Sequence, residues 1–113
     1  MKRDLTEHEI RELLEHESYG HLACCDDLAR PYVVPVAFVY RENAVYCFSF
    51  EGEKTRIMRK NPHVCFQVER LREPTGWRSA MAWGTYEELA GKDRDDAYAL
   101  MLEHLWMQSN KNH

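Results

Sequence analysis

Hydrophobic side chains are concentrated in a run near the middle of the chain. From Tyr32 to Tyr40 the residues are apolar almost without interruption and rich in β-branched and aromatic types, which predicts a strand buried on both faces. A polar turn follows at 41–43, and a second apolar run at 44–50 can pair back on the first. The pattern therefore predicts a β-hairpin at the centre of the fold.

The segments before and after this hairpin show the hydrophobic periodicity of helices in some places and of strands in others. Thr6 and Glu9 have the spacing of a capping box, and the apolar residues after them predict a helix over 6–17. The other predicted elements are strand 21–25, a short basic helix that ends at Asn61-Pro62, strands 63–69 and 77–89, and a helix from 93 to about 107. This order predicts a mainly β (α+β) fold, a small antiparallel barrel with flanking helices, built as one domain over 1–113.

Composition narrows the class of protein. The 113 residues carry a formal net charge of −4, which argues against nucleic acid or an anionic membrane as the partner. No hydrophobic signal core follows the N-terminus, so we expect a cytoplasmic protein. The four cysteines lack the spacing of a zinc site, and we interpret them as reduced structural residues.

Trp77 and Trp83 share one face of a predicted strand. They could lie in the core, at a dimer interface or against a planar ring, and the core is the default interpretation.

A basic segment, from Lys54 to Lys60, follows the hairpin in a chain that is otherwise acidic. Helix-start amides and a lysine such as Lys54 bind phosphate together, because both present donors and positive potential to one point. A solvated helix surface is the alternative interpretation.

Pro35 cannot donate a ladder hydrogen bond, so the strand is an edge or bulges there, or its amide side faces a ligand. The sequence contains no phosphate-binding loop, dinucleotide fingerprint, metal-ligand cluster or acid–base pair, so no catalytic residue is assigned and any redox chemistry is expected from a bound cofactor.

Four segments taken together resemble one protein family in their order and spacing. They are PYVVPVAFVY at 31–40, VYCFSFEGEK at 45–54, MRKNPHVCFQV at 58–68 and WRSAMAWGT at 77–85. Over residues 5–107 the chain is similar to the pyridoxamine 5′-phosphate oxidase-like FMN-binding split barrels, in particular the branch that includes nitroimidazole-resistance proteins. The resemblance implies a split-barrel fold and a homodimer with two FMN sites at its interface.

The resemblance also implies which residues bind the cofactor. They are Tyr32, Val34, Pro35 and Val36 along the flavin, Phe48 and Ser49 at the ring and phosphate side, Lys54 at the phosphate, and Ser79 from the fifth strand of the partner subunit. Two positions depart from the family pattern. Many relatives carry a histidine at the position of Phe48, and family members usually continue past the last helix into a further strand that we expect this domain to lack.

The function that the resemblance implies is that of an FMN-dependent oxidoreductase. It would pass electrons from a reduced nicotinamide or another donor to a small organic acceptor. The alternative is a non-catalytic dimeric module that binds flavin or haem for sensing or storage, or that has lost its cofactor. The absence of histidine at Phe48 favours this alternative. Pyridoxamine phosphate oxidase activity itself is not expected, because the chain is too short to supply that enzyme's additional substrate-phosphate contacts.

Overall fold

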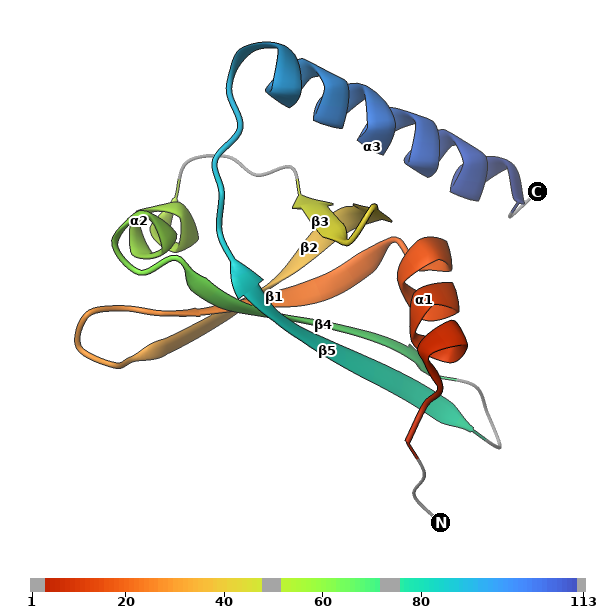
Figure 1. The fold of residues 1–113 in the computed structure, drawn as a ribbon, viewed down its shortest axis with the longest axis horizontal. Coiled ribbons are helices and arrows are strands. Elements are labelled where there is room, and N and C mark those ends of the chain that lie inside the picture. Colours follow the sequence, from red (N-terminus) through yellow and green to blue (C-terminus); the bar gives the residue numbers. More distant parts are fainter. Residues whose placement is uncertain (1–3, 48–51, 72–75, 112–113) are drawn as a thin grey trace.

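The strands of the protein form one antiparallel sheet in the order β3-β2-β1-β4-β5. The computed structural model describes residues 4–47, 52–71 and 76–111, with side chains as far as residue 107. The elements are α1 (Glu7–His16), β1 (Tyr19–Cys25), β2 (Pro31–Arg41), β3 (Ala44–Cys47), α2 (Glu53–Lys60), β4 (His63–Leu71), β5 (Trp77–Thr85) and α3 (Gly91–Lys111). Figure 1 shows a sharply twisted sheet with α2 and α1 at its two ends and α3 running past β3. The predicted curled antiparallel sheet with flanking helices is confirmed.

The first helix begins where the capping-box spacing predicts it. The backbone N–H of Glu9 donates to Thr6 Oγ1 at 3.1 Å, and the N–H of Thr6 donates to Glu9 Oε1 at 2.9 Å. These bonds satisfy amides that a helix start otherwise leaves unpaired. Arg70 on β4 ties α1 to the sheet, because its guanidinium donates to Glu12 and to Glu17 at 3.0 Å each. The bond from Arg70 holds the pKa of Glu12 below its ordinary value.

Strand pairing defines an inner and an outer face of the sheet. His21 of β1 pairs with Pro35 of β2 and with Gln67 of β4. Gln67 pairs in turn with Met81 of β5. Since paired residues share a face and neighbours along a strand alternate, each face can be listed. The outer face carries Tyr19, His21, Val33, Pro35, Gln67, Trp77, Ser79, Met81 and Trp83, and the inner face carries Leu22, Tyr32, Val34, Val36, Phe66 and Val68.

The core lies between the inner face and the first two helices. Leu13 and Leu14 of α1 belong to a cluster whose other buried members come from the sheet: Val36, Phe38, Phe66 and Val68. Ile57 and Met58 of α2 pack around Cys24 in a second cluster. Each cluster buries apolar surface that the twisted sheet alone would leave in water. The third helix contacts β2 and β3.

The central strand differs from its prediction in the first half. Phe38 and Val39 are neighbours on opposite faces, and both are buried, with 1% and 4% of their surface exposed. In contrast, Val33 is 62% exposed and Pro35 is also exposed. The prediction of a strand buried on both faces is therefore right only for the second half of β2. In the part of the chain that the structure describes, the first half has no layer over its outer face.

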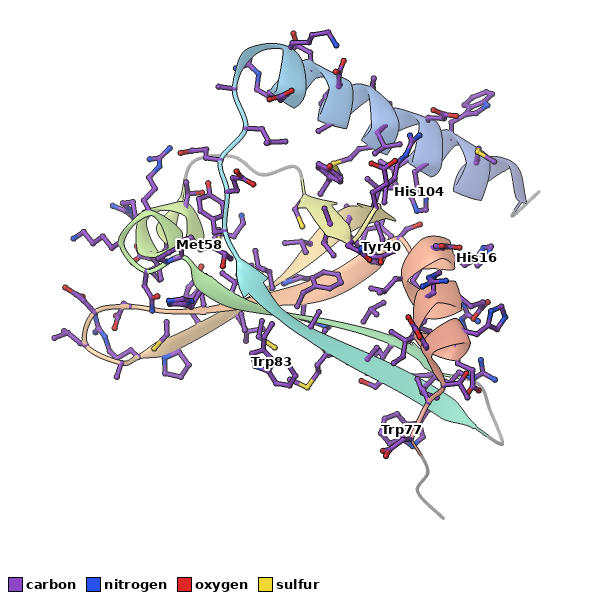
Figure 2. All side chains as sticks on the ribbon, in the orientation of Figure 1. His16, Tyr40, Met58, Trp77, Trp83 and His104 are labelled. Carbon is purple, nitrogen blue, oxygen red and sulfur yellow. The ribbon has the colours of Figure 1, made fainter. Side chains whose placement is uncertain are left out.

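The two tryptophans of β5 also differ from their default interpretation. Trp77 and Trp83 are 68% and 76% exposed, and Figure 2 shows both on the side of β5 that faces away from α2 and α3. Their interpretation as core residues is wrong for the single chain. Alternation along a strand shows that two residues share a face, but it does not show which face is covered.

Element boundaries move by a few residues from those that the sequence predicts. β1 begins at Tyr19 and includes Gly20, so it starts two residues before the strand that the sequence predicts at 21–25. β5 ends at Thr85, earlier than predicted, and α3 extends beyond both predicted ends. Of the helices within the described ranges, none is both long enough and apolar enough to cross a membrane.

Candidate functional site

Lys54, at the start of α2, lies close enough to two thiols for its charge to act on them. Lys54 is the second residue of the helix and is partly buried. Burial raises the pKa of the Cys47 thiol to about 11 and also raises that of Cys24, and in both cases the charge of Lys54 opposes the shift. The ammonium therefore lies near the end of β3 and the inner face of β1. The predicted contacts Phe48 and Ser49 follow Cys47 and lie outside the described residues.

The two arginines of the basic segment have carboxylate partners, and Lys60 is exposed at the other end of the helix. Arg56 pairs with Glu53 at 2.8 Å, and Arg59 pairs with Glu88 at 2.7 Å. Lys54 forms no ion pair with any of the described residues. Gly52 is the N-cap of α2 and supplies no side-chain cap to the first amides of the helix. The capacity to bind an anion at this helix start therefore rests on Lys54 and on first-turn amides that Gly52 leaves without a side-chain cap.

Three of the predicted contacts on β2 project from the inner face. Tyr32 is partly buried and packs against the cluster around Ile57 and Met58. Val34 is also partly buried, at the edge of the larger core cluster. Val36 is 7% exposed and belongs to that core, so a ligand could reach only its backbone.

Pro35 lies on the outer face, opposite His21. The register between β1 and β2 is unbroken across it, so the strand does not bulge there. β3 pairs only with the segment from Phe38 to Arg41, so within the described ranges the second edge of β2 is unpaired at Pro35. A proline on a free edge costs no ladder hydrogen bond on that side. The edge position accounts for Pro35, and a ligand-facing role stays a prediction.

Ser79 belongs to a chain of hydrogen bonds that no local sequence pattern indicates. His21 Nδ1 lies 3.1 Å from Gln67 Oε1, and Gln67 Nε2 donates to Ser79 Oγ at 2.9 Å. The three side chains come from β1, β4 and β5 and share the outer face. Alternation within each strand could have placed them on one face. The pairing of β1 with β4, however, joins residues 46 apart, which a local pattern does not reveal.

The sheet separates the predicted site residues into two groups. Tyr32, Val34 and Lys54 lie on the inner side, where α2 packs. Pro35 and Ser79 lie on the outer face. A single chain therefore does not bring the two groups to one ligand.

The outer face also presents a large apolar surface. We define the outer apolar surface as five side chains that are each more than half exposed: Tyr19, Val33, Trp77, Met81 and Trp83. Single exposed apolar residues are common, but several gathered on one sheet face are typical of a contact surface. Tryptophan and methionine are also among the residue types enriched in protein interfaces.

Comparison with known proteins gives a consistent family. The family model described as "Pyridoxamine 5'-phosphate oxidase" matches residues 6–113. An uncharacterised protein of Rhizobium meliloti (strain 1021) is 34% identical over 87 residues, which are 77% of this chain and 57% of that protein. The chain thus spans a little over half the length of this curated relative.

Solved structures show the same fold. A FAD-binding protein from Mesorhizobium loti superposes with a TM-score of 0.79 at 36% identity, over 88% of this chain and 75% of that one. A candidate 5-nitroimidazole antibiotic resistance protein from Bacteroides thetaiotaomicron gives 0.71 at 20% identity, over 88% and 66%. A heme-binding protein from Mycobacterium smegmatis gives 0.71 at 19% identity, over 88% and 43%.

The similarities to the nitroimidazole-resistance and heme-binding proteins concern the fold alone. Together with the FAD-binding protein, these structures confirm the predicted split-barrel fold. The family match covers nearly the whole chain and includes every strand described above. The chain belongs to the pyridoxamine 5′-phosphate oxidase-like family.

Proposed function

We propose that the protein is a homodimeric FMN-binding flavoprotein that passes electrons to a small organic acceptor. The observation that carries the proposal is Lys54, a partly buried cation with no ion-pair partner in the described ranges, at a helix start whose N-cap is a glycine. Such an arrangement suits a phosphate, because the ammonium and the first-turn amides donate to the same anion. The similar structure at 36% identity is that of a FAD-binding protein, which supports a flavin as the ligand.

The ion pairs of the two arginines on α2 favour FMN over FAD as the ligand. Lys54 and one helix start can hold the single phosphate of FMN. A pyrophosphate would call for further cationic contacts, yet Arg56 and Arg59 of the same helix are already paired with carboxylates. We therefore assign the mononucleotide to this chain.

The chain's own residues bind and orient the cofactor in this proposal. Lys54 anchors the phosphate, and the partly buried side chains of Tyr32 and Val34 offer an apolar wall beside it. Val36 contributes its backbone, and Phe48 and Ser49 complete the ring and phosphate side. The flavin, when bound, supplies the electron transfer.

A second copy of the chain completes the site. Pro35 and Ser79 lie across the sheet from Lys54, so they can contact the same flavin only from the partner subunit. The outer apolar surface supports such an assembly, because a dimer would bury side chains that the single chain leaves in water.

A non-catalytic flavin- or haem-binding module is the second candidate. The described thiol nearest in sequence to Lys54 favours it, since burial raises the pKa of Cys47 to about 11 and keeps that thiol protonated at neutral pH. The absorption spectrum of the purified protein separates these ligands, because flavin bands and a Soret band are distinct. Reduction of bound flavin by a reduced nicotinamide, followed by reoxidation with an organic acceptor, would support the enzyme over the module.

Replacing Lys54 with alanine tests the phosphate anchor. We expect the affinity for FMN to fall by about 1.5–3 kcal/mol, roughly 10- to 150-fold, because one charge-assisted contact is lost. Fluorescence titration of the apoprotein with FMN measures the change. Lys60→Ala is the matched control, since Lys60 is exposed at the other end of the same helix, and it should bind FMN as the wild type does. Equal affinities of Lys54→Ala and wild type would remove Lys54 from the site.

A further inference from the structure

A pocket of about 430 Å³ lies where β1 begins, on the outer side of the sheet. Its lining includes Glu17, Ser18, Tyr19, His21, Pro35 and Glu69. The volume is within the range of small-molecule sites in proteins. The pocket is separate from the helix start that carries Lys54, which lies on the inner side. The proposed flavin site uses Pro35 of this lining, from the partner subunit, but gives no role to His21, Glu17 or Glu69.

The hydrogen bond between His21 and Gln67 determines what the imidazole offers to the pocket. Gln67 Nε2 donates to Ser79, which leaves Oε1 of the same amide facing His21 Nδ1 at 3.1 Å. With this orientation of the Gln67 amide Nδ1 carries the proton, because an amide oxygen can only accept. In the neutral ring, Nε2 is then an acceptor.

The charged groups of the pocket are acceptors as well. Glu17 shares its carboxylate with Arg70 at 3.0 Å. The side chain of Glu69 is exposed and forms neither a hydrogen bond nor an ion pair within the described ranges. No lysine or arginine belongs to the lining formed by those residues. The matching ligand is therefore a donor that carries positive charge.

Tyr19 and Pro35 give the pocket an apolar side. An exposed tyrosine ring attracts a cation to its face and packs against an apolar group. We propose that this pocket binds a small organic cation, a primary ammonium or amidinium attached to a ring. The cationic group donates to Glu69 and to His21 Nε2, and the ring lies against Tyr19 and Pro35. Pro35 and Tyr19 also lie on the face that the proposed dimer would cover, so this binding requires that the partner subunit leaves the pocket open.

Titration of the ¹⁵N-labelled, flavin-free protein with benzylammonium tests the proposal by NMR. Benzyl alcohol and benzoate serve as neutral and anionic probes with the same ring. We expect saturable shifts of the amides of Gly20, His21 and Glu69 with benzylammonium, and binding of benzyl alcohol weaker by about tenfold. Similar binding of all three probes, shifts that map elsewhere, or no saturable shift because a partner subunit fills the pocket would each overturn it.

Two charge-matched variants separate a specific contact from general attraction. Glu69→Gln should weaken benzylammonium binding by about five- to tenfold. Glu42→Gln removes the same charge from the exposed β2–β3 turn and should leave binding unchanged. Equal losses in the two variants would contradict a site at Glu69. Gln67→Leu should lower the population of the His21 tautomer that is protonated on Nδ1 and should weaken binding. An unchanged tautomer would contradict the role given to Gln67.

Discussion

Replacing Gly20 with alanine is expected to destabilise the protein by at least about 3 kcal/mol, and to prevent folding if the margin is small. A Cβ at this position would lie 2.5 Å from Phe66 Cζ and 2.7 Å from the backbone oxygen of Gln67. Phe66 belongs to the larger core cluster, and Gln67 is fixed in the ladder between β1 and β4. Neither neighbour can give way without breaking packing or pairing, because protein interiors are close-packed.

Gly84 provides the matched control, since it also lies in a strand but a Cβ there would meet nothing within 4 Å. Gly84→Ala should be neutral or stabilising by up to about 1 kcal/mol, because the unfolded chain loses conformational freedom. Urea unfolding followed by circular dichroism measures both variants. A Gly20→Ala protein as stable as Gly84→Ala would show that β1 and β4 do not approach each other as described.

The second large effect is expected at the proposed dimer interface. Trp83 is the most exposed member of the outer apolar surface. Trp83→Glu should raise the dimer dissociation constant by about a hundredfold or more, because it removes a large aromatic anchor and places a charge in a desolvated interface. Sedimentation equilibrium over a concentration series measures the change.

Trp106→Glu on α3 is the control for this experiment. Trp106 is 68% exposed, so the variant introduces the same charge at a similarly exposed tryptophan on another surface. It should dimerise as the wild type does. If Trp106→Glu dissociates and Trp83→Glu does not, the interface includes α3 and the outer sheet face is free.

Most of the fold follows from local sequence signals. The capping box at Thr6 and Glu9 forms as its spacing predicts, and Asn61-Pro62 ends α2. These signals act within one turn of the chain, so the sequence displays them directly. Gly20 shows the limit of such signals. A glycine after a helix favours a break, yet here it belongs to β1, and the close approach of Phe66 leaves no room for a larger side chain.

The candidate site could be predicted only in part, for a related reason. The basic segment after the hairpin indicates an anion-binding helix start, and the structure places Lys54 in the first turn of α2. The separation of Ser79 from Lys54 depends on strand register, and so does the bond between His21 and Gln67. Register joins residues far apart in the sequence, so alternation alone could not reveal either feature.

The central claim is that two copies of the chain build each flavin site, one with Lys54 and the other with Ser79. Mixed dimers of Lys54→Glu and Ser79→Asp chains test it most directly. Each variant alone should bind little FMN, because every site in its homodimer contains a defect. In the mixed dimer one site would contain both defects and the other none, so we expect one tightly bound FMN per dimer, against two for the wild type. A mixed dimer that binds no FMN, with wild type still binding two, would place Lys54 and Ser79 at one site within a single chain and would contradict the account.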